Sequence, residues 1–392
     1  MRKSFLCSLC VLLALALAAP AVAEPAALTC GVRDIQVFGN LVLDLAPTAL
    51  AEAGYEYGDV LSLTVDGTEY QVPFCTNYSD VDVNETVLRD SEGVLTLAIN
   101  MGDFATQNGI AAKVATGEDA FAWQVSGGRE IGDLQVSIVL AVKGGYRDEY
   151  LSRQLFSTNA REDYASDAVF ANFRAVAGGA LGENALFRSS SPLNNDLGRA
   201  AYANALLAES GVRTVVNLSD SREQIEAFAA QEGFDSAEYM ALYDAGQVIA
   251  LQMGVDFTTD DFKARLGRGL QFMATQEGPY LVHCSEGKDR AGFVCALLSC
   301  FMGANYEAAI DDYMTSFENY FPLTEGSEQY EAVKNSNIVP MLETIAGVEA
   351  GADLRAIDLV AAAREYILST GLSTEEVDAL YANLAKDYSA EF

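Results

Sequence analysis

The feature that most constrains this chain is a polar stretch, HCSEGKDRAG, that runs from His283 to Gly292 between two apolar runs. The run before it, PYLV, has the length of a buried strand, and the run after it, FVCALLSCFM, has the length of a helix. Alternating strands and helices build a mostly parallel sheet flanked by helices. The stretch also contains the only histidine of the 392 residues, directly before Cys284.

The polar stretch has the composition of a phosphate trap that contains a nucleophile. Backbone N–H groups of the loop and the start of the following helix can converge on one anion. The same groups, together with Arg290, would stabilise a thiolate at Cys284. The planar fork of Arg290 can bind two phosphoryl oxygens, Gly287 gives the tight turn its freedom, and His283 is placed to brace the loop backbone. Phosphate-binding positions are also expected at Ser285, Glu286 and Lys288.

Other chemistries fit these residues less well. A cysteine protease needs a second residue, a histidine, as base, and the chain has no further histidine. A zinc site lacks ligands for the same reason, so no metal or organic cofactor is expected. Sulfur transfer on such a loop stays open, although a bidentate arginine suits a phosphoryl dianion better. The plainest alternative is a buried cysteine at a strand end before an ordinary helix cap.

HCSEGKDRAG resembles the signature loop of the cysteine-dependent protein tyrosine phosphatase superfamily, in particular the bacterial tyrosine/lipid phosphatases whose loop reads HCxxGKDRTG. NFRAVAGGALGENALFRSSSPLNN (172–195) is similar to the NFRD and RSS opening of that branch, and TVVNLSDSREQIE (214–226) to its DLR and E segment. The resemblance covers residues 165–392. It implies the α/β fold of the cysteine phosphatases and a phosphorylated protein or small-molecule phosphate ester as substrate.

The resemblance also implies roles for single residues. Cys284 would attack phosphorus to form a phosphocysteine, while Arg290 and the loop amides stabilise the equatorial oxygens. Asp289 would protonate the leaving group and then activate water. Asp256 is the alternative acid, since other branches carry theirs on a loop at about this distance before the cysteine. It can equally be a solvated residue ahead of a helix capped by a threonine.

The chain departs from the family pattern at two positions. Ala291 stands where a Thr or Ser hydroxyl helps the thiolate leave, which favours slow turnover or phospholigand binding without turnover. Glu286 adds negative charge where lipid-directed members often carry a basic residue, which weakens the case for a polyphosphorylated inositol. Arg174, Arg188 and Arg199 can restore positive charge as substrate-binding residues, or can form structural or surface ion pairs.

The residues from 28 to 150 predict a separate all-β domain. Short alternating runs separated by turn residues are typical of a small barrel or sandwich. The strands are expected at 32–38, 58–65, 68–74, 93–100 and 134–142. We place this domain at 24–155 and the phosphatase domain, with strands at 212–218 and 279–284 and a helical tail from about residue 330, at 156–392.

The β domain resembles the β-barrel C-terminal domain of the S-adenosylmethionine hydroxide adenosyltransferase and halogenase family. The matching segments are IQVFGNLVLDL (35–45), CTNYSDVDVNE (75–85) and GVLTLAINMGDFATQNGI (93–110). The catalytic partner domain of that family has no counterpart here, so its activity is not expected. The barrel can offer a ligand surface or shape the substrate cleft, or it can be a spacer or an oligomerisation unit.

Residues 1–23 have the pattern of a secretory signal peptide: Arg2 and Lys3, a short apolar run, and a small-residue site ending at Ala23. Its removal leaves 22 basic against 56 acidic residues, a net charge of −34, which argues against nucleic acid or an anionic membrane as partner. No later run has the roughly 18 apolar residues of a membrane span. A soluble protein outside the cytoplasm is expected, whether secreted, periplasmic or on the cell surface.

The cysteines of the mature chain fall into three groups. Cys30 and Cys75 lie in the β domain and could pair in an oxidising compartment. Cys295 and Cys300 lie in a helical apolar pattern and are expected to be buried thiols. Cys284 is the candidate nucleophile. The sequence thus predicts a secreted cysteine-dependent phosphatase, acting on phosphotyrosine first and on phosphoinositides or inositol phosphates second, with a pseudophosphatase that binds phosphorylated ligands as the rival.

Overall fold

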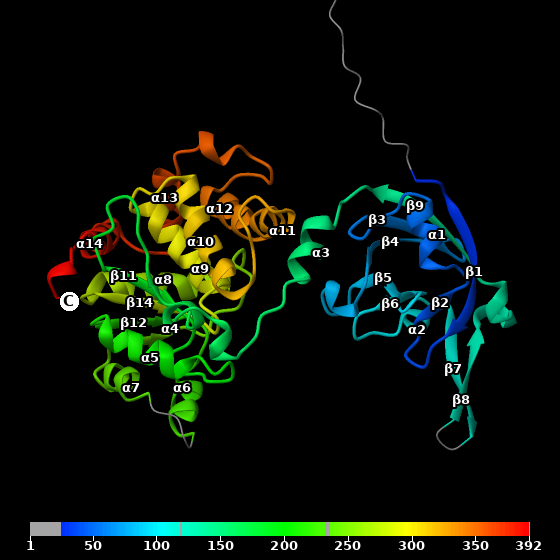
Figure 1. The fold of residues 1–392 in the computed structure, drawn as a ribbon, viewed down its shortest axis with the longest axis horizontal. Helices are drawn as coiled ribbons and strands as arrows, with labels where there is room; N and C mark the ends of the chain where they lie inside the picture. The colour runs from blue at the N-terminus through cyan, green and yellow to red at the C-terminus, as the bar shows by residue number, and fades with distance from the viewer. Residues whose placement is uncertain (1–24, 118–119, 232–235, 392) are drawn as a thin grey trace, which may run out of the picture. The chain divides into compact units, whose positions relative to one another are not determined.

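The computed structural model describes residues 25–117, 120–231 and 236–391 and divides into two compact units after Tyr146 (Figure 1). This division precedes the 155/156 boundary placed from the sequence. The reason is helix α3 (Arg147–Arg153), which packs on α11 (Glu328–Val333) of the second unit and forms the ion pair Arg147–Glu328 at 2.7 Å. The signal peptide expected at 1–23 lies outside the described residues.

The first unit is a closed barrel of seven strands, which confirms the small barrel expected from the sequence; β2 and β5 were not among the five strands expected. Closure leaves the barrel without the exposed edges at which open sheets pair with other chains. Neighbouring strands are antiparallel except for β4 and β5, which are parallel. The order is β1 (Leu28–Ile35), β2 (Leu41–Leu43), β6 (Val94–Ile99), β5 (Thr86–Ser91), β4 (Thr68–Cys75), β3 (Val60–Val65) and β9 (Gln135–Val142). Helices α1 (Pro47–Glu52) and α2 (Phe104–Gln107) and a hairpin of β7 (Ala111–Gly117) and β8 (Ala120–Val125) complete the unit.

Side-chain alternation explains why these segments form a barrel. In β3, every second residue (Leu61, Leu63 and Val65) is buried in the barrel core, because successive side chains of a strand point to opposite faces. Asp66 and Gly67 connect β3 to β4 with positive φ angles of 53° and 83°, the backbone that a tight hairpin requires.

The cysteines of the barrel do not pair with each other. Cys30 lies in β1 and Cys75 ends β4, and both are buried thiols. In the barrel order, β9 and β3 lie between these two strands on one side, and β2, β6 and β5 on the other. The disulfide considered from the sequence is therefore absent, because the topology keeps the two strands apart.

The second unit contains a five-stranded sheet with the order β10 (Arg174–Ala175), β11 (Leu186–Ser189), β14 (Tyr280–His283), β12 (Thr214–Asn217) and β13 (Val248–Ala250). The last four strands are parallel, and β10 is an antiparallel edge strand. The predicted mostly parallel α/β sheet is confirmed, and so are the strands expected at 212–218 and 279–284. The strand β14 comes last in the chain but pairs between β11 and β12.

Helices cover both faces of this sheet (Figure 1). The side chains of the strands alternate between the two helical layers. Leu281 and Val215 face the layer of α5 (Ala200–Glu209), α6 (Arg222–Ala229) and α7 (Ala237–Asp244). Val282 and Val216 face the opposite layer. Burial on both faces explains why these strands are apolar throughout. The opposite layer comprises α8 (Asp260–Thr275), α9 (Asp289–Phe301), α10 (Tyr306–Tyr320), α12 (Val339–Ala346), α13 (Leu359–Ser369) and α14 (Thr374–Leu384).

Helix α9 is the centre of that layer. Every residue from Ala291 to Phe301 is buried, which is why its sequence is apolar on all sides. Cys295 and Cys300 are buried thiols, as predicted, and burial raises the pKa of each to about 12. The last helix, α14, begins with a capping box formed by Ser373 and Glu376. Across the described ranges, none of the helices combines the length and the apolar character that crossing a bilayer requires.

Candidate active site

The residues from Cys284 to Arg290, here called the 284–290 loop, connect the central strand β14 to the N-terminus of α9. Because β14 pairs with β11 on one side and β12 on the other, the loop emerges between the ends of both neighbours. The N–H of Leu218, just after β12, donates to the His283 carbonyl at 3.0 Å, and that of Ser191, just after β11, donates to the Ser285 carbonyl at 3.1 Å. The carboxyl ends of parallel strands are the usual place for a ligand site in such a sheet.

Four successive carbonyl groups of this loop are bound by the protein behind it. The Ser285 carbonyl accepts from the backbone of Ser191, and the Glu286 carbonyl accepts from the Tyr320 hydroxyl at 2.5 Å. The Gly287 and Lys288 carbonyls accept from Nη2 of Arg188 at 2.8 and 3.1 Å. In a trans peptide, the carbonyl and the next N–H point in opposite directions. These bonds therefore direct the N–H groups that follow away from the protein, toward the mouth of the loop.

The N–H groups of the loop are left for a ligand. Of the hydrogen bonds among the described residues, none has the backbone N–H of Ser285, Glu286, Gly287 or Lys288 as its donor. The start of α9 adds the partial positive charge of a helix N-terminus at the same place. Converging N–H groups at a helix start form an anion-binding concavity.

Gly287 is required by this geometry. Its φ is +71°, in the left-handed region, and a Cβ there would overlap the carbonyl group of Ser189 in the neighbouring strand. Gly292 has a related role, because a Cβ there would lie 2.5 Å from the Tyr313 ring. Both glycines thus allow the loop and α9 to approach the sheet and α10 closely.

Cys284 lies at the base of the loop, with only 3% of its surface exposed. The half-buried Arg290 is fixed at two points: Nη1 donates to the Met253 carbonyl and Nη2 to the Ser285 hydroxyl, each at 3.1 Å. The structure therefore brings the predicted nucleophile, arginine and loop residues together on one short connection. A guanidinium held in this way is preorganised for a bidentate oxyanion.

The two candidate acids differ in their surroundings. Asp289 is the first residue of α9, its side chain is 45% exposed, and its carboxylate lies 3.8 Å from the Lys288 ammonium. Asp256 is exposed, and hydrogen bonds from the Thr258 hydroxyl (2.6 Å) and backbone N–H hold its pKa below the ordinary value. These hydrogen bonds favour the charged form of Asp256, which cannot donate a proton. Asp289 lies within the loop itself, and this position favours it as the acid.

The charged side chains of the loop offset one another. Lys288 lies 3.4 Å from Glu286 and 4.9 Å from the centre of the Phe317 ring. Burial opposes the charge on Lys288, but Asp289 and Glu286 outweigh this effect and raise its pKa. Within the loop itself, the two positive charges of Lys288 and Arg290 are therefore balanced by the carboxylates of Glu286 and Asp289.

His283 is fully buried at the end of β14. Its Nδ1 lies 3.4 Å from the Cys284 carbonyl, and its ring makes an edge contact with Tyr239 at 5.7 Å. Burial lowers the pKa of His283 to about 4, and the nearby Asp220 offsets only part of this effect. The imidazole is therefore neutral at pH 7 and contacts the loop through a dipole and not through a charge.

Arg174 and Arg188 lie behind the loop and share one carboxylate. Arg188 is fully buried and donates to Asp312 Oδ2 at 2.6 Å, while Arg174 donates to Asp312 Oδ1 at 3.1 Å and to Asn172 Oδ1 at 2.6 Å. Burial and the neighbouring Arg188 lower the pKa of Arg174 to about 10. Burial alone would raise the pKa of Asp312, but the two guanidinium groups hold it below its ordinary value. These bonds favour the structural ion pair over direct substrate contact.

Arg199 is also buried, with 1% of its surface exposed. Its guanidinium lies over the Tyr320 ring at 4.0 Å from the centre and makes long hydrogen bonds of 3.4 Å, among them one to the Tyr164 hydroxyl. It therefore packs on the ring of Tyr320, whose hydroxyl binds the Glu286 carbonyl.

Three residues of the site were not predicted as functional. The side chain of Asn172 donates to the carbonyls of Glu286 and Gly287, each at 3.2 Å. Asn172 has a positive φ of 49° and is the first residue of the NFR motif. Asp312 and Tyr320 both lie on α10, within a segment whose pattern only predicts a helix. Their partners are far away in the chain, so no local signal marks them.

Metal ligands do not gather in the part of the chain that the structure describes: no group of three or more His, Cys, Asp or Glu side chains is suited to hold an ion.

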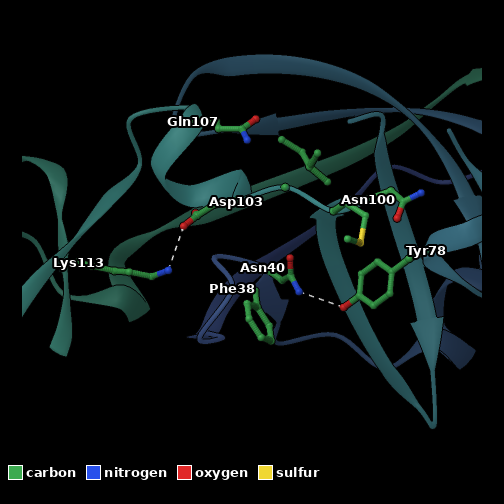
Figure 2. Close-up of a pocket in the computed structure, with 10 residues that line it drawn as sticks. Phe38, Asn40, Tyr78, Asn100, Asp103, Gln107 and Lys113 are labelled. Carbon is green, nitrogen blue, oxygen red and sulfur yellow. Dashed lines mark hydrogen bonds and ion pairs between the residues drawn. The ribbon is translucent and has the colours of Figure 1, made fainter. Parts of the chain in front are cut away.

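The barrel contains a second candidate site, a cavity of about 590 Å³ shown in Figure 2. Asn40 donates to the Tyr78 hydroxyl at 3.0 Å, and Lys113 pairs with Asp103 at 3.3 Å. Phe38 is 71% exposed at the edge. The remaining lining residues are Ile99, Asn100, Met101, Gly102 and Gln107. The cavity combines apolar rim groups with amides, as small-ligand pockets do.

The fold and the loop define the second unit as a phosphatase. The model of the tyrosine phosphatase family matches residues 169–386, more than half of the chain, and the chain belongs to this family. The barrel matches the model of the S-adenosylmethionine hydroxide adenosyltransferase C-terminal domain over residues 32–115. Both resemblances drawn from the sequence are thereby confirmed.

Two solved structures are similar to parts of the chain. The crystal structure of P. aeruginosa TpbA is 18% identical, covers 59% of this chain and 98% of its own, and has a TM-score of 0.22. An uncharacterized conserved protein from Thermotoga maritima is 21% identical, covers 30% of this chain and 38% of its own, and has a TM-score of 0.23. This chain thus spans well under half of the length of the Thermotoga protein. No curated protein matches the chain.

Proposed function

We propose that this phosphatase cleaves phosphate monoesters through a phosphocysteine intermediate on Cys284. The thiolate attacks phosphorus, the bond from phosphorus to the ester oxygen breaks, and Asp289 gives its proton to the leaving oxygen. Asp289 then takes a proton from water, and the resulting hydroxide attacks the phosphorus of the S–P bond. Inorganic phosphate leaves, and the thiolate is restored.

The observation that carries this proposal is the arrangement of the 284–290 loop. Four of its carbonyls are bound from behind, which turns the N–H groups that follow them away from the protein. Arg290 is held beside them by the Met253 carbonyl and the Ser285 hydroxyl. Donors fixed in advance around developing negative charge are the largest single contribution in many enzymes. The neutral His283 supports the Cys284 carbonyl without adding a charge.

Phosphotyrosine is the favoured substrate class, with phosphoinositides or inositol phosphates as the second. Cys284 is almost fully buried, so a long aryl ester reaches it more readily than a short alkyl ester. Glu286 and Asp289 offset Lys288 and Arg290, which leaves no net positive charge in the loop for a substrate with several phosphates. This balance supports a monoester with one phosphoryl group.

The test is turnover of p-nitrophenyl phosphate by the wild type and by Cys284→Ser. We expect steady turnover by the wild type, loss of at least 10³-fold in the variant, and a phosphocysteine trapped by rapid acid quench. Full activity in Cys284→Ser would refute the mechanism. Absent turnover in a wild type that binds phosphotyrosine tightly would instead support the rival pseudophosphatase, which the buried Ala291 favours.

We also propose that the protein acts outside the cytoplasm after removal of residues 1–23, on the pattern of its first residues. Mass spectrometry of the protein exported by its host should find a chain that begins at Glu24. For the barrel, the cavity of Figure 2 supports a ligand surface over a plain spacer.

A further inference from the structure

Behind the 284–290 loop lies a buried set of side chains, here called the rear cluster. It consists of Asn172, Arg174, Arg188, Asp312 and Tyr320. None of them is placed to touch a phosphate ester in the mechanism above. Their contacts run instead to the loop carbonyls, on the opposite side of the peptide groups from the N–H donors.

Asp312 is the anchor of this cluster. Its two oxygens bind two different arginines, Arg174 at 3.1 Å and Arg188 at 2.6 Å, and only 13% of its side chain is exposed. Arg188 connects Asp312 to the loop, because its Nη1 binds Asp312 while its Nη2 binds the Gly287 and Lys288 carbonyls. A planar guanidinium held at one end has little freedom at the other.

Tyr320 adds a second point of attachment from the same helix. Its hydroxyl donates to the Glu286 carbonyl, and the Nδ2 of Asn172 bridges the Glu286 and Gly287 carbonyls at 3.2 Å. Helix α10 thus holds three successive peptide groups of the loop, two through Asp312 and Arg188 and one through Tyr320. Because these peptides are trans, fixing their carbonyls fixes the direction of the N–H groups on the other side.

We propose that Asp312 is a positioning residue for phosphate binding, which acts through Arg188 to aim the amides of the 284–290 loop at the phosphoryl oxygens. The proposal rests on the function proposed above and adds to it the element that shapes the loop. Loss of the Asp312 carboxylate should then weaken phosphate binding, which is the opposite of what its charge alone predicts. Asp312 is the one carboxylate of the rear cluster, and removing a negative charge behind an anion site should by itself tighten anion binding.

The experiment measures binding of inorganic phosphate by calorimetry to the full chain carrying Cys284→Ser, at pH 7 and fixed ionic strength. Adding Asp312→Asn should weaken phosphate binding by about 10-fold or more, the loss expected for a misplaced hydrogen bond to a charged group. Asp311→Asn is the matched control, since it removes the same charge from the adjacent, exposed position of α10. It should change phosphate affinity by less than twofold. Equal or tighter binding in the folded Asp312→Asn protein would overturn the proposal.

A second variant guards against loss of the fold, because Asp312→Asn leaves two buried arginines without a carboxylate. Arg188→Lys keeps the charge but cannot reach Asp312 and two carbonyls at once, so it should weaken phosphate binding to a similar extent. If both proteins unfold, Tyr320→Phe is measured instead, because it removes only one hydroxyl from the rear cluster. Its phosphate binding should be about threefold to tenfold weaker. Unchanged phosphate affinity in whichever folded variant is tested would refute the positioning role.

The result separates this inference from the proposed function. If the Cys284→Ser parent binds phosphate and the variants bind it equally well, only the positioning role fails. If the parent binds no phosphate and the wild type turns over no aryl phosphate, the loop is not a phosphate site and both proposals fail.

Discussion

The single buried histidine should make the stability of this protein depend on pH in a way that can be calculated. His283 is fully buried, with Asp220, Arg290 and Tyr239 as its titratable or charged neighbours. Its pKa is about 4 in the folded protein and about 6.5 in an unfolded chain. Between these values, the unfolded chain binds a proton that the folded protein does not, so falling pH favours unfolding.

The magnitude follows from the same two values. Each pH unit inside the window is worth about 1.4 kcal/mol, and allowance for partial titration near pH 6.5 gives a loss of about 2 kcal/mol in the free energy of unfolding between pH 7 and pH 5. The contribution is fully present above about pH 6.5 and decreases as the pH falls toward 4. Carboxylates titrate mainly below pH 5, which leaves this range to the histidine.

Urea unfolding of the wild type and of His283→Asn at pH 7, 6 and 5 measures the effect. The wild type should lose about 2 kcal/mol more than the variant over this range, because the variant has no imidazole to titrate. The ¹⁵N chemical shifts of the one imidazole should in addition stay those of a neutral ring at pH 5. Equal losses in the two proteins, or an imidazolium spectrum at pH 5, would refute the reasoning.

Three further changes test the loop. Gly287→Ala should reduce kcat by at least 100-fold and lower Tm strongly, whereas Gly246→Ala, with a similar φ of +75° but open space at its Cβ, should cost only about 1 kcal/mol and leave kcat unchanged; similar losses in both would contradict the clash. Asp289→Asn should slow esters of poor leaving groups by about 100-fold more than p-nitrophenyl phosphate, while Asp256→Asn should affect both alike; the reverse ranking would assign the acid to Asp256. Ala291→Ser should speed hydrolysis of the intermediate and reduce the pre-steady-state burst relative to the steady rate, and an unchanged burst would show that the hydroxyl is not needed.

The parts of the molecule that could be predicted from the sequence are those with a local pattern. The alternation Leu61, Leu63, Val65 predicts a half-buried strand, and the Cys-to-Arg spacing after an apolar run predicts a loop between a strand and a helix. Both follow from chemistry within a few residues of the chain. The barrel, the parallel sheet and the family could therefore be predicted without coordinates.

The rear of the site could not be predicted in the same way. Asp312 meets Arg174 and Arg188 only because α10 packs behind the loop, more than a hundred residues further along the chain. The two arginines could be found in the NFR and RSS segments. The direction of their side chains could not be predicted, because the same side chain can face a ligand or a carboxylate. The short strands β10 and β13 were missed as well, because two or three residues are too few to show a period.

The position of β14 ties the activity of this protein to completion of its fold. The strands β11 and β12 are made first along the chain, yet they pair with β14 and not with each other. A chain that ends before residue 280 therefore has a gap in the middle of its sheet and lacks Cys284, the proposed nucleophile. Phosphatase turnover should appear only after this last strand inserts. The time at which activity appears during refolding therefore reports when the sheet is completed.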